Sequence, residues 1–495
     1  MTIFSRMLEE ELIKLGSTPQ QFVQKYNFLA RERALADQLT NAGFRQWRQG
    51  RLPRSSRLSL IASTFAALAD DDGAQALGLD EIVRFWRETR GLQQDNQLAW
   101  PAIDIQGPPA DSKLKLFRRI RAKRKEFRIQ EQLALRAREY YTNIDMPWSR
   151  PAPYFLAATD WQLDRPIPLT GDTISYLLIE PDANPFEQTG LSGCWPPDPT
   201  GKTIDKYSEA VTAYDSPEPN LWTNDTSYRL MAVNRVAEDK FDLAFSDMTY
   251  FDGFDSWAAL EYESIAQLLA EQEFAGPHRN ALGNPFDLTN RNVALGISVL
   301  TLRRDPAGRS QFYLHYRQGT ATLNNMFGAL PAGEFQPSSK GWEAIKNDLD
   351  IWGNILREYG EELLGDEPAR FQTASGPDYM SREPYLSLDR NRGEGVRPYL
   401  LDIGLDPITL KAGLRVVCVF DADVFDEVFG DMRLQNDEGE IHVPRDMREK
   451  GRPYVGFPFT EESVKKKLDS RDLTQAARYL LEATWFYRTE LGVGD

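Results

Sequence analysis

The sequence predicts an α+β protein of several domains, in which an N-terminal all-α domain precedes a mixed α/β body. Apolar residues recur at helical spacing through about the first 92 residues. A polar, proline-containing stretch follows at residues 93–110. After residue 146, short alternating runs that are typical of strands are interspersed with helical patterns. With 495 residues, 41% of them apolar, the chain is long enough to bury several cores.

The same patterns predict four regions. They are a helical domain at residues 1–92, a linker and basic helix at 93–145, an α+β middle domain at 146–290 and a further domain at 291–495. Residues 1–150 hold 25 Lys and Arg against 18 Asp and Glu, a net charge of +7, whereas the remainder holds 33 against 56, a net charge of −23. This asymmetry predicts that only the first part meets an anionic partner, although an ordinary basic helical domain would have the same charge.

Cysteine and histidine usage argues against several classes of site. The chain has only two cysteines, Cys194 and Cys418, which is too few for a disulfide framework or a zinc cluster. His278, His315 and His442 are widely scattered, so a histidine-rich metal site is not expected. The N-terminus has no apolar signal-peptide core, and no apolar run approaches membrane length. We therefore expect a cytoplasmic protein without a membrane partner.

The most informative N-terminal stretch is residues 32–53. Ala34 is a small residue inside a helical pattern, Leu39 is the apolar residue that would close a turn, and Thr40 can cap the next helix by accepting a backbone N–H. This arrangement resembles the phage-repressor type of helix-turn-helix, the xenobiotic-response-element family. The resemblance implies an N-terminal helix-turn-helix domain whose second helix, after Thr40, reads base edges in the major groove of double-stranded DNA.

The outer face of that helix carries side chains suited to base recognition. Phe44 and Trp47 are three residues apart and would pack inward, which leaves Asn41, Arg45 and Gln46 outside. Asn and Gln pair bidentately with adenine and Arg with guanine, while further arginines would hold phosphates. The predicted DNA-binding residues are Thr40, Asn41, Arg45, Gln46, Arg48, Arg51, Arg54 and Arg57. The alternative is a small helical domain whose arginines are only solvated.

A second basic segment follows the linker. Nine Lys and Arg residues crowd into positions 113–128, with apolar residues between them, and predict one amphipathic helix over about 112–140. Such a helix can contact DNA phosphates, a membrane surface or an acidic protein surface. Docking on the acidic body of the same chain and extension of a DNA footprint are both open, beside a solvated linker helix.

The middle region is predicted to contain paired strands at 228–233 and 240–245, and a helix over 258–274. Aromatic and acidic residues alternate just before that helix. Either they line a ligand pocket or they belong to an ordinary core. The aromatic residues concerned are Tyr250, Phe251, Phe254 and Trp257.

The C-terminal region centres on residues 357–362, Arg-Glu-Tyr-Gly-Glu-Glu, which we expect near the end of a helix that starts at about Trp342. Glu358, Glu361 and Glu362 are spaced i, i+3 and i+4, so in a regular helix their carboxylates share one face. Three anions on one face repel each other, and a hard divalent cation such as Mg²⁺ would relieve that repulsion. Strand-like runs at 293–302 and 311–316 precede this helix.

Residues 357–362 resemble the second half of the Nudix box, and residues 328–334 resemble the strand end and loop that lead into it. The resemblance implies a Nudix-like β-sheet with flanking helices, Mg²⁺ as the cofactor, and Glu358, Glu361 and Glu362 as its ligands. The chain departs from the family pattern in its spacing, because Gly333 and Arg357 are 24 positions apart (357 − 333), and in having Leu349 where the pattern has Glu. No catalytic residue is assigned.

Three functions follow from these patterns. The leading hypothesis is a transcriptional regulator that binds double-stranded DNA as a homodimer and senses a small nucleotide-like effector, by resemblance, in its Nudix-like domain. The second is a Mg²⁺-dependent Nudix pyrophosphohydrolase, and the third is a protein-interaction module without DNA binding. The regulator requires Asn41, Arg45 and Gln46 exposed on a short helix. The enzyme requires its three glutamates within reach of one metal ion, and the interaction module an exposed apolar patch in residues 1–110.

Overall fold

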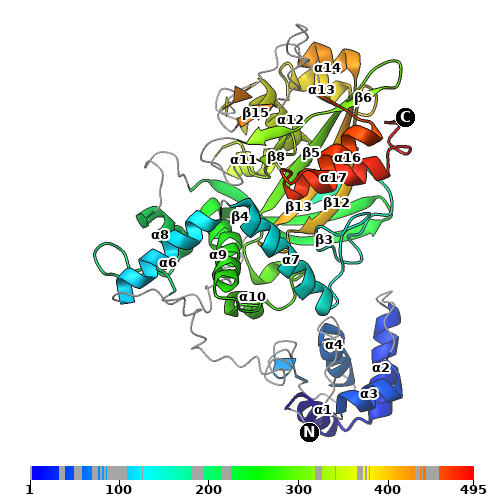
Figure 1. Cartoon of the computed structure of the whole chain (residues 1–495). Helices are drawn as coiled ribbons and strands as arrows, with labels where there is room; N and C mark the ends of the chain where they lie inside the picture. The colour runs from blue at the N-terminus through cyan, green and yellow to red at the C-terminus, as the bar shows by residue number, and fades with distance from the viewer. Residues whose placement is uncertain are drawn as a thin grey trace. The chain divides into compact units, whose positions relative to one another are not determined.

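The polar stretch at residues 93–110 contains the point at which the chain divides into two units, Met1–Ala99 and Trp100–Asp495. Figure 1 shows the computed structural model, and each unit is described by itself. The structure describes residues 3–32, 39–48, 58–69, 76–77, 81–82, 85, 109–124, 126–179, 194–214, 224–317, 326–339, 342–364, 372–373, 376–377, 380–429, 435–436, 439–441 and 456–494.

The named elements in the described part of unit 1 are helices. They are α1 (Ile3–Lys14), α2 (Pro19–Glu32), α3 (Asn41–Arg48) and α4 (Leu58–Ala69). Gly16 follows α1 with φ +57°, a left-handed conformation that glycine adopts without a steric penalty. Pro19 occupies the first position of α2, where its missing N–H has no intrahelical partner to lose. The helices pack around Phe22, whose ring lies 4.7 Å from that of Phe44 and 4.9 Å from that of Phe65.

The N-terminal part of unit 2 is a helical layer. Its elements are α6 (Pro109–Lys123), α7 (Phe127–Asn143), α8 (Tyr207–Tyr214), α9 (Tyr250–Leu269), α10 (Pro277–Leu282) and the short turn η2 (Leu288–Asn290). The prediction of one basic helix over 112–140 was wrong, because α6 ends at Lys123 and a second helix, α7, begins at Phe127. The amide of Gln130 donates to the carbonyl oxygen of Arg124 at 2.9 Å, and Glu126 forms an ion pair with Lys123 at 2.7 Å.

Helix α9 begins eight residues before the predicted start at residue 258. Thr249 and Asp252 form a capping box, in which the hydroxyl of Thr249 accepts from the backbone N–H of Asp252 and the carboxylate of Asp252 accepts from the backbone N–H of Thr249. This reciprocal cap satisfies two backbone donors that a helix start otherwise leaves open. Phe251 and Phe254, which apolar alternation does not place in a helix, therefore belong to its first turns.

A seven-stranded sheet forms the centre of unit 2, in the order β1-β12-β13-β5-β6-β16, with β9 paired to β5. β13 runs parallel to β5 and antiparallel to β12. The strands are β1 (Ile167–Pro168), β5 (Leu295–Arg304), β6 (Ser310–Phe312), β9 (Ala332–Glu334), β12 (Val396–Leu405), β13 (Ala412–Asp421) and β16 (Phe457–Pro458). Because β1 pairs with β12, residues 146–290 and 291–495 share one sheet within one unit.

Smaller sheets complete unit 2. The predicted strand pair at 228–233 and 240–245 is confirmed, since β3 and β4 pair antiparallel. The strands are β2 (Ile174–Leu178), β3 (Thr226–Ala237) and β4 (Lys240–Thr249) in one sheet, β7 (His315–Arg317), β8 (Met326–Gly328), β14 (Gln435–Asn436) and β15 (Gly439–Ile441) in another, and β10 (Gln372–Thr373) with β11 (Gly376–Pro377). The mixed α/β character predicted for the body is therefore present.

The remaining helices flank the sheets. They are α11 (Trp342–Asn347), α12 (Ile351–Tyr359), η3 (Gly360–Leu364), α13 (Tyr385–Arg390), α14 (Ala422–Val428), α16 (Glu461–Asp469) and α17 (Gln475–Phe486). α17 packs on β5, β12 and β13, and Figure 1 shows it with α16, in red, against the central sheet. Among the helices that the structure describes, none combines the length and the apolar character needed to cross a membrane.

Candidate functional site

Helix α3 starts at the residue that the sequence predicts. The hydroxyl of Thr40 accepts a hydrogen bond from the backbone N–H of Gly43 at 3.0 Å, which caps the first turn. The chain entering the helix is held by Asn27 of α2, whose side-chain oxygen accepts from the N–H of Leu39 at 2.7 Å and whose amide nitrogen donates to the carbonyl of Leu39 at 2.8 Å. Asn27 was missed by sequence reasoning because it lies 12 residues from its partner.

The two faces of α3 divide as its apolar spacing predicts. Phe44 and Trp47 are 1% and 5% exposed and pack against α2. Asn41, Arg45 and Gln46 are exposed. The side chains predicted to read bases therefore lie together on the outer face of a short helix whose inner face is fixed in a core.

Of the other predicted DNA-binding residues, Arg48 is ion-paired within unit 1 and three arginines lie outside the described residues. The Arg48 guanidinium forms a two-point ion pair with Glu9 of α1, in which Nε approaches Oε1 and Nη2 lies 3.0 Å from Oε2. Arg48 thus links α3 to α1 within unit 1. Arg51, Arg54 and Arg57 lie outside the described residues, as does Ala34, so the first helix of the predicted motif and its turn are not described.

The acidic helix of unit 2 is shorter than predicted. A helix running from Trp342 to the acidic residues was expected, but α11 and α12 are separate. Asp350 starts α12 by accepting from the backbone N–H groups of Trp352 and Gly353 at 3.3 and 2.9 Å, and this cap ends the preceding segment. α12 then widens into the π-helical turn η3, which carries Glu361 and Glu362. Such turns occur frequently at functional sites.

Each of the three glutamates faces a different neighbour. The carboxylate of Glu358 packs on Gly333, where a Cβ atom would lie 2.2 Å from the Glu358 carboxyl carbon. Glu362 Oε1 accepts from the backbone N–H of Ala332 at 2.7 Å, and Glu361 Oε1 lies 3.4 Å from Arg357 Nε. Among the described residues, no group of three or more His, Cys, Asp or Glu side chains is placed to hold a metal ion. Glu358 and Glu362 both contact residues 332–333, whereas Glu361 lies beside Arg357.

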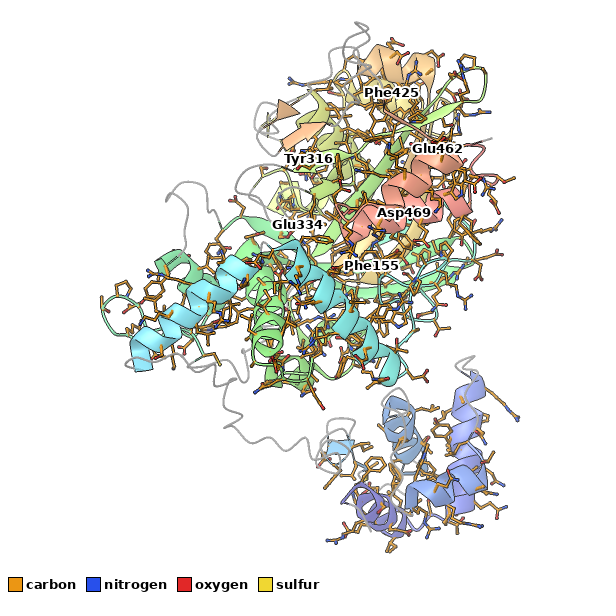
Figure 2. All side chains as sticks on the ribbon, viewed as in Figure 1. Phe155, Tyr316, Glu334, Phe425, Glu462 and Asp469 are labelled. Carbon is orange, nitrogen blue, oxygen red and sulfur yellow. The ribbon has the colours of Figure 1, made fainter. Side chains whose placement is uncertain are left out.

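The predicted loop and the predicted helix do meet. Residues 332–333 contact Glu358 and Glu362 as described above, and Glu334 at the end of β9 (Figure 2) fixes the far side of the loop. Its carboxylate accepts from Lys411 Nζ at 2.7 Å and from the Ser227 hydroxyl at 2.9 Å. The structure therefore brings Ala332 and Gly333 of this loop into contact with Glu362 and Glu358.

A buried histidine adjoins Glu362 and was not singled out by the sequence. His315 is 1% exposed, and its Nδ1 lies 3.3 Å from Glu362 Oε2. Neither ring nitrogen of His315 has a hydrogen-bond partner among the described residues. Beside this pair, the hydroxyls of Thr301 and Tyr359 are hydrogen-bonded at 2.7 Å. Burial raises the pKa of Tyr359 well above its ordinary value, so this phenol remains protonated. These residues form a buried polar cluster.

The close packing of Glu358 on Gly333 makes a specific prediction. A methyl group at Gly333 forces the carboxylate of Glu358 out of its place, and overpacking of this kind costs about 1–3 kcal/mol. We expect Gly333→Ala to lower the free energy of unfolding of unit 2 by that amount in urea titrations of the full chain. Gly171→Ala is the matched control, because no atom lies within 4 Å of its added Cβ. Equal stability of the two variants would contradict the contact.

The aromatic residues at the N-terminal end of α9 form a packed cluster. Phe254 is buried, and its ring lies 6.0 Å from that of Tyr250 and 5.1 Å from that of Trp257. Trp257 in turn lies between two cations, with the Arg124 guanidinium 5.5 Å and Lys411 Nζ 5.4 Å from its ring centre. Tyr250 and Trp257 are only partly buried, and both cations form ion pairs, Arg124 with Glu261 and Lys411 with Glu334.

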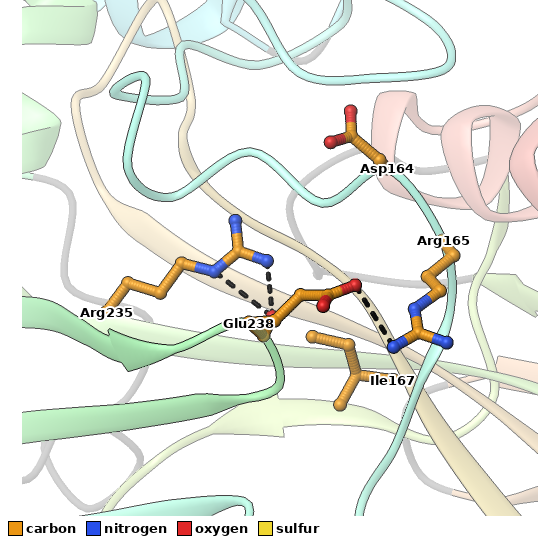
Figure 3. Close-up of a pocket in the computed structure, with 5 residues that line it drawn as sticks. All are labelled: Asp164, Arg165, Ile167, Arg235 and Glu238. Atoms are coloured by element: carbon orange, nitrogen blue, oxygen red, sulfur yellow. Dashed lines mark hydrogen bonds and ion pairs between the residues drawn. The ribbon is translucent and has the colours of Figure 1, made fainter.

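A separate hollow lies on the surface of unit 2 (Figure 3). Its rim carries the exposed ion pair of Arg165 Nη2 and Glu238 Oε1 at 3.1 Å, and Arg235 Nη1 donates to the carbonyl of Gln162 at 2.9 Å. The volume is about 100 Å³, below the roughly 300 Å³ at which small-molecule sites begin. The lining residues are Asp164, Arg165, Ile167, Arg235 and Glu238.

Comparisons with known proteins add no further assignment. No protein-family model matches the chain, and a search of curated proteins finds no significant match.

Proposed function

We propose that the protein is a transcriptional regulator that binds double-stranded DNA through α3 and senses a small nucleotide-like effector in unit 2. The observation that supports the DNA-binding part best is the outer face of α3. Asn41, Arg45 and Gln46 are exposed together, while the inner residues Phe44 and Trp47 are buried. These three polar side chains are of the types that pair with adenine and guanine edges in the major groove.

The effector part of the proposal rests on the contact between residues 328–334 and 357–362. In this arrangement the carboxylates of Glu358 and Glu362 bind the loop of their own chain, so the site holds its parts together before any ligand arrives. A ligand that competes for these contacts would shift the loop. Effector binding at such a place favours sensing over hydrolysis, and regulators of this kind commonly act as homodimers that read two half-sites.

The test is selection from a mixed genomic DNA library by the purified full chain at two salt concentrations, followed by sequencing. We expect enrichment of a short inverted repeat. Arg45→Ala should weaken binding to that repeat about 5- to 150-fold, because a bidentate base contact contributes about 1–3 kcal/mol of discrimination. Arg31→Ala is the control, since Arg31 is an exposed arginine of α2 outside the predicted DNA-binding set. Retention without any sequence preference would refute the proposal.

A Mg²⁺-dependent pyrophosphohydrolase is the second candidate. The π-helical turn η3 favours it, as does buried His315, whose Nδ1 lies 3.3 Å from Glu362 Oε2 and whose ring nitrogens have no hydrogen bond to a described residue, because functional sites often carry such features. The assay is release of phosphate products from nucleoside diphosphate derivatives with Mg²⁺, with Glu361→Gln as the test variant. Turnover that Glu361→Gln abolishes would establish the enzyme, and absence of turnover across such substrates would remove it.

A further inference from the structure

Most of the net positive charge of the first 150 residues lies in residues 100–150, outside the unit that contains α3. Residues 1–99 hold 13 Lys and Arg against 12 Asp and Glu, a net charge of +1, whereas residues 100–150 hold 12 against 6, a net charge of +6. Within unit 1, Glu9 also neutralises Arg48 of α3. Affinity for the DNA backbone depends on neutralised phosphates, so a unit with almost no net charge is a weak source of it.

Helix α6 carries most of that excess and is divided into two faces. Its inner face is packed, since Phe117 and Ile120 are buried and α6 contacts α9. Arg121 of α6 and Arg124, which follows the C-terminal end of the helix, also turn inward. Arg124 Nε lies 2.5 Å from Glu261 Oε2, and Arg121 Nη1 donates to the hydroxyl of Tyr207 at 3.2 Å. These contacts fix α6 on the body of unit 2.

The outer face of α6 presents three other cations. Lys115, Arg118 and Arg119 are exposed, and none of them forms an ion pair with a residue that the structure describes. Their spacing of i, i+3 and i+4 places them on one side of the helix, within about 6 Å along its axis at about 1.5 Å per residue. We call these three residues the α6 stripe.

We propose that the α6 stripe binds backbone phosphates of DNA, so that unit 2 supplies sequence-independent affinity while α3 of unit 1 supplies sequence preference. This inference rests on the proposed DNA-binding function. A helix that lies in a membrane surface inserts its apolar face, whereas the apolar face of α6 is buried against α9. Among the described residues of α6, the exposed side chains are mostly cationic and its large apolar side chains are buried or half-buried, which fits a polyanion.

The expected effect is a change in salt dependence. Each neutralised phosphate contributes about −0.9 to the slope of log K against log salt concentration, so loss of three contacts reduces the slope by up to about 2.7. Between 50 and 200 mM salt, this corresponds to a difference of up to about 40-fold in how much affinity is lost. Removal of the stripe is therefore distinguishable from loss of a base contact, because losing a base contact leaves the salt slope nearly unchanged.

The experiment measures binding of full-length protein to one DNA duplex, recovered from the selection or otherwise random, across that salt range. The test variant is Lys115→Ala/Arg118→Ala/Arg119→Ala, in which alanine preserves helix propensity. The control removes the same charge from exposed cations elsewhere on unit 2, as Arg309→Ala/Lys465→Ala/Lys466→Ala. Thermal unfolding of both variants checks that unit 2 is intact.

A slope reduced by two or more in the α6 variant, with less than half a unit of change in the control, would support the proposal. An unchanged slope, equal reductions in both variants, or no binding by wild-type protein at 50 mM salt would overturn it. Binding of both proteins to anionic phospholipid vesicles is measured alongside. If the α6 variant lost vesicle binding but kept the DNA binding of the wild type, the proposal would be overturned in favour of a membrane surface. Failure of the proposed base recognition by α3 gives a different result, since a DNA complex without sequence preference can still show the α6-dependent slope.

Discussion

Trp47→Ala is expected to unfold unit 1 and to abolish DNA binding, while unit 2 unfolds as in the wild type. Trp47 is 5% exposed, and its ring meets those of Tyr26 and Phe44 edge-on at 6.2 and 5.9 Å. Truncation of a buried tryptophan to alanine costs about 3–5 kcal/mol. Small domains have total stabilities of about 5–15 kcal/mol, so this loss is a large part of what holds unit 1 folded.

Calorimetry of the full chain, combined with hydrogen exchange of the α3 amides, measures this effect. We expect faster exchange in α3 and a lowered or absent transition for unit 1, with the transition of unit 2 unmoved because the ring contacts of Trp47 lie within unit 1. Arg45→Ala on the same helix is the control, since an exposed substitution changes stability by about 0.5 kcal/mol or less. If Trp47→Ala retained sequence-specific binding, the buried inner face of α3 would not be what positions its outer face.

Local spacing was sufficient to predict helix α3 and its two faces. Thr40 can cap, and Phe44 and Trp47 recur at helical spacing, so the start and the two faces of α3 follow from eight consecutive residues. The neutralisation of Arg48 could not be predicted in the same way, because its partner Glu9 lies 39 residues away on another helix. An arginine on a predicted surface and one held by a distant carboxylate look the same in sequence.

For the acidic residues at 357–362, the sequence predicted a contact with residues 328–334 but not its geometry. The residues at 357–362 and 328–334 were identified as parts of one site, and they are in contact. Their geometry was not predictable, because the i, i+3, i+4 rule assumes a regular helix and η3 is π-helical. His315 lies 47 positions from Glu362 (362 − 315), and nothing in its strand marks it as different from a core residue. Only tertiary contacts reveal such pairs.

Breaking the buried ion pair between two strands of the central sheet should give the largest loss of stability in unit 2. Arg415 of β13 and Asp402 of β12 are 4% and 2% exposed, and Arg415 Nη1 lies 2.6 Å from Asp402 Oδ2. The guanidinium also lies over the ring of Phe155, 3.3 Å from its centre. Phe155 is labelled in Figure 2. Arg415→Ala leaves Asp402 buried without its cation, and breaking a buried pair in this way costs about 3–5 kcal/mol.

The loss should depend on pH with a definite sign. Burial raises the pKa of Asp402 to about 6, although Arg415 lowers it, so removing Arg415 raises this pKa further. An acid whose pKa is raised in the folded state stabilises that state at low pH and ceases to do so as pH rises through the folded value. The deficit of Arg415→Ala relative to wild type is therefore expected to be larger at pH 8 than at pH 5 in urea titrations.

A second variant separates the lost charge from lost packing. Asp402→Leu/Arg415→Met replaces both partners by apolar groups, and buried ion pairs replaced in this way are often as stable as before or more so. We expect the double variant to regain most of the stability that Arg415→Ala loses, and to show no pH dependence from position 402. If it were as unstable as Arg415→Ala at both pH values, the main role of Arg415 would be its packing on Phe155 and its hydrogen bond to the carbonyl of Gly413 at 3.0 Å.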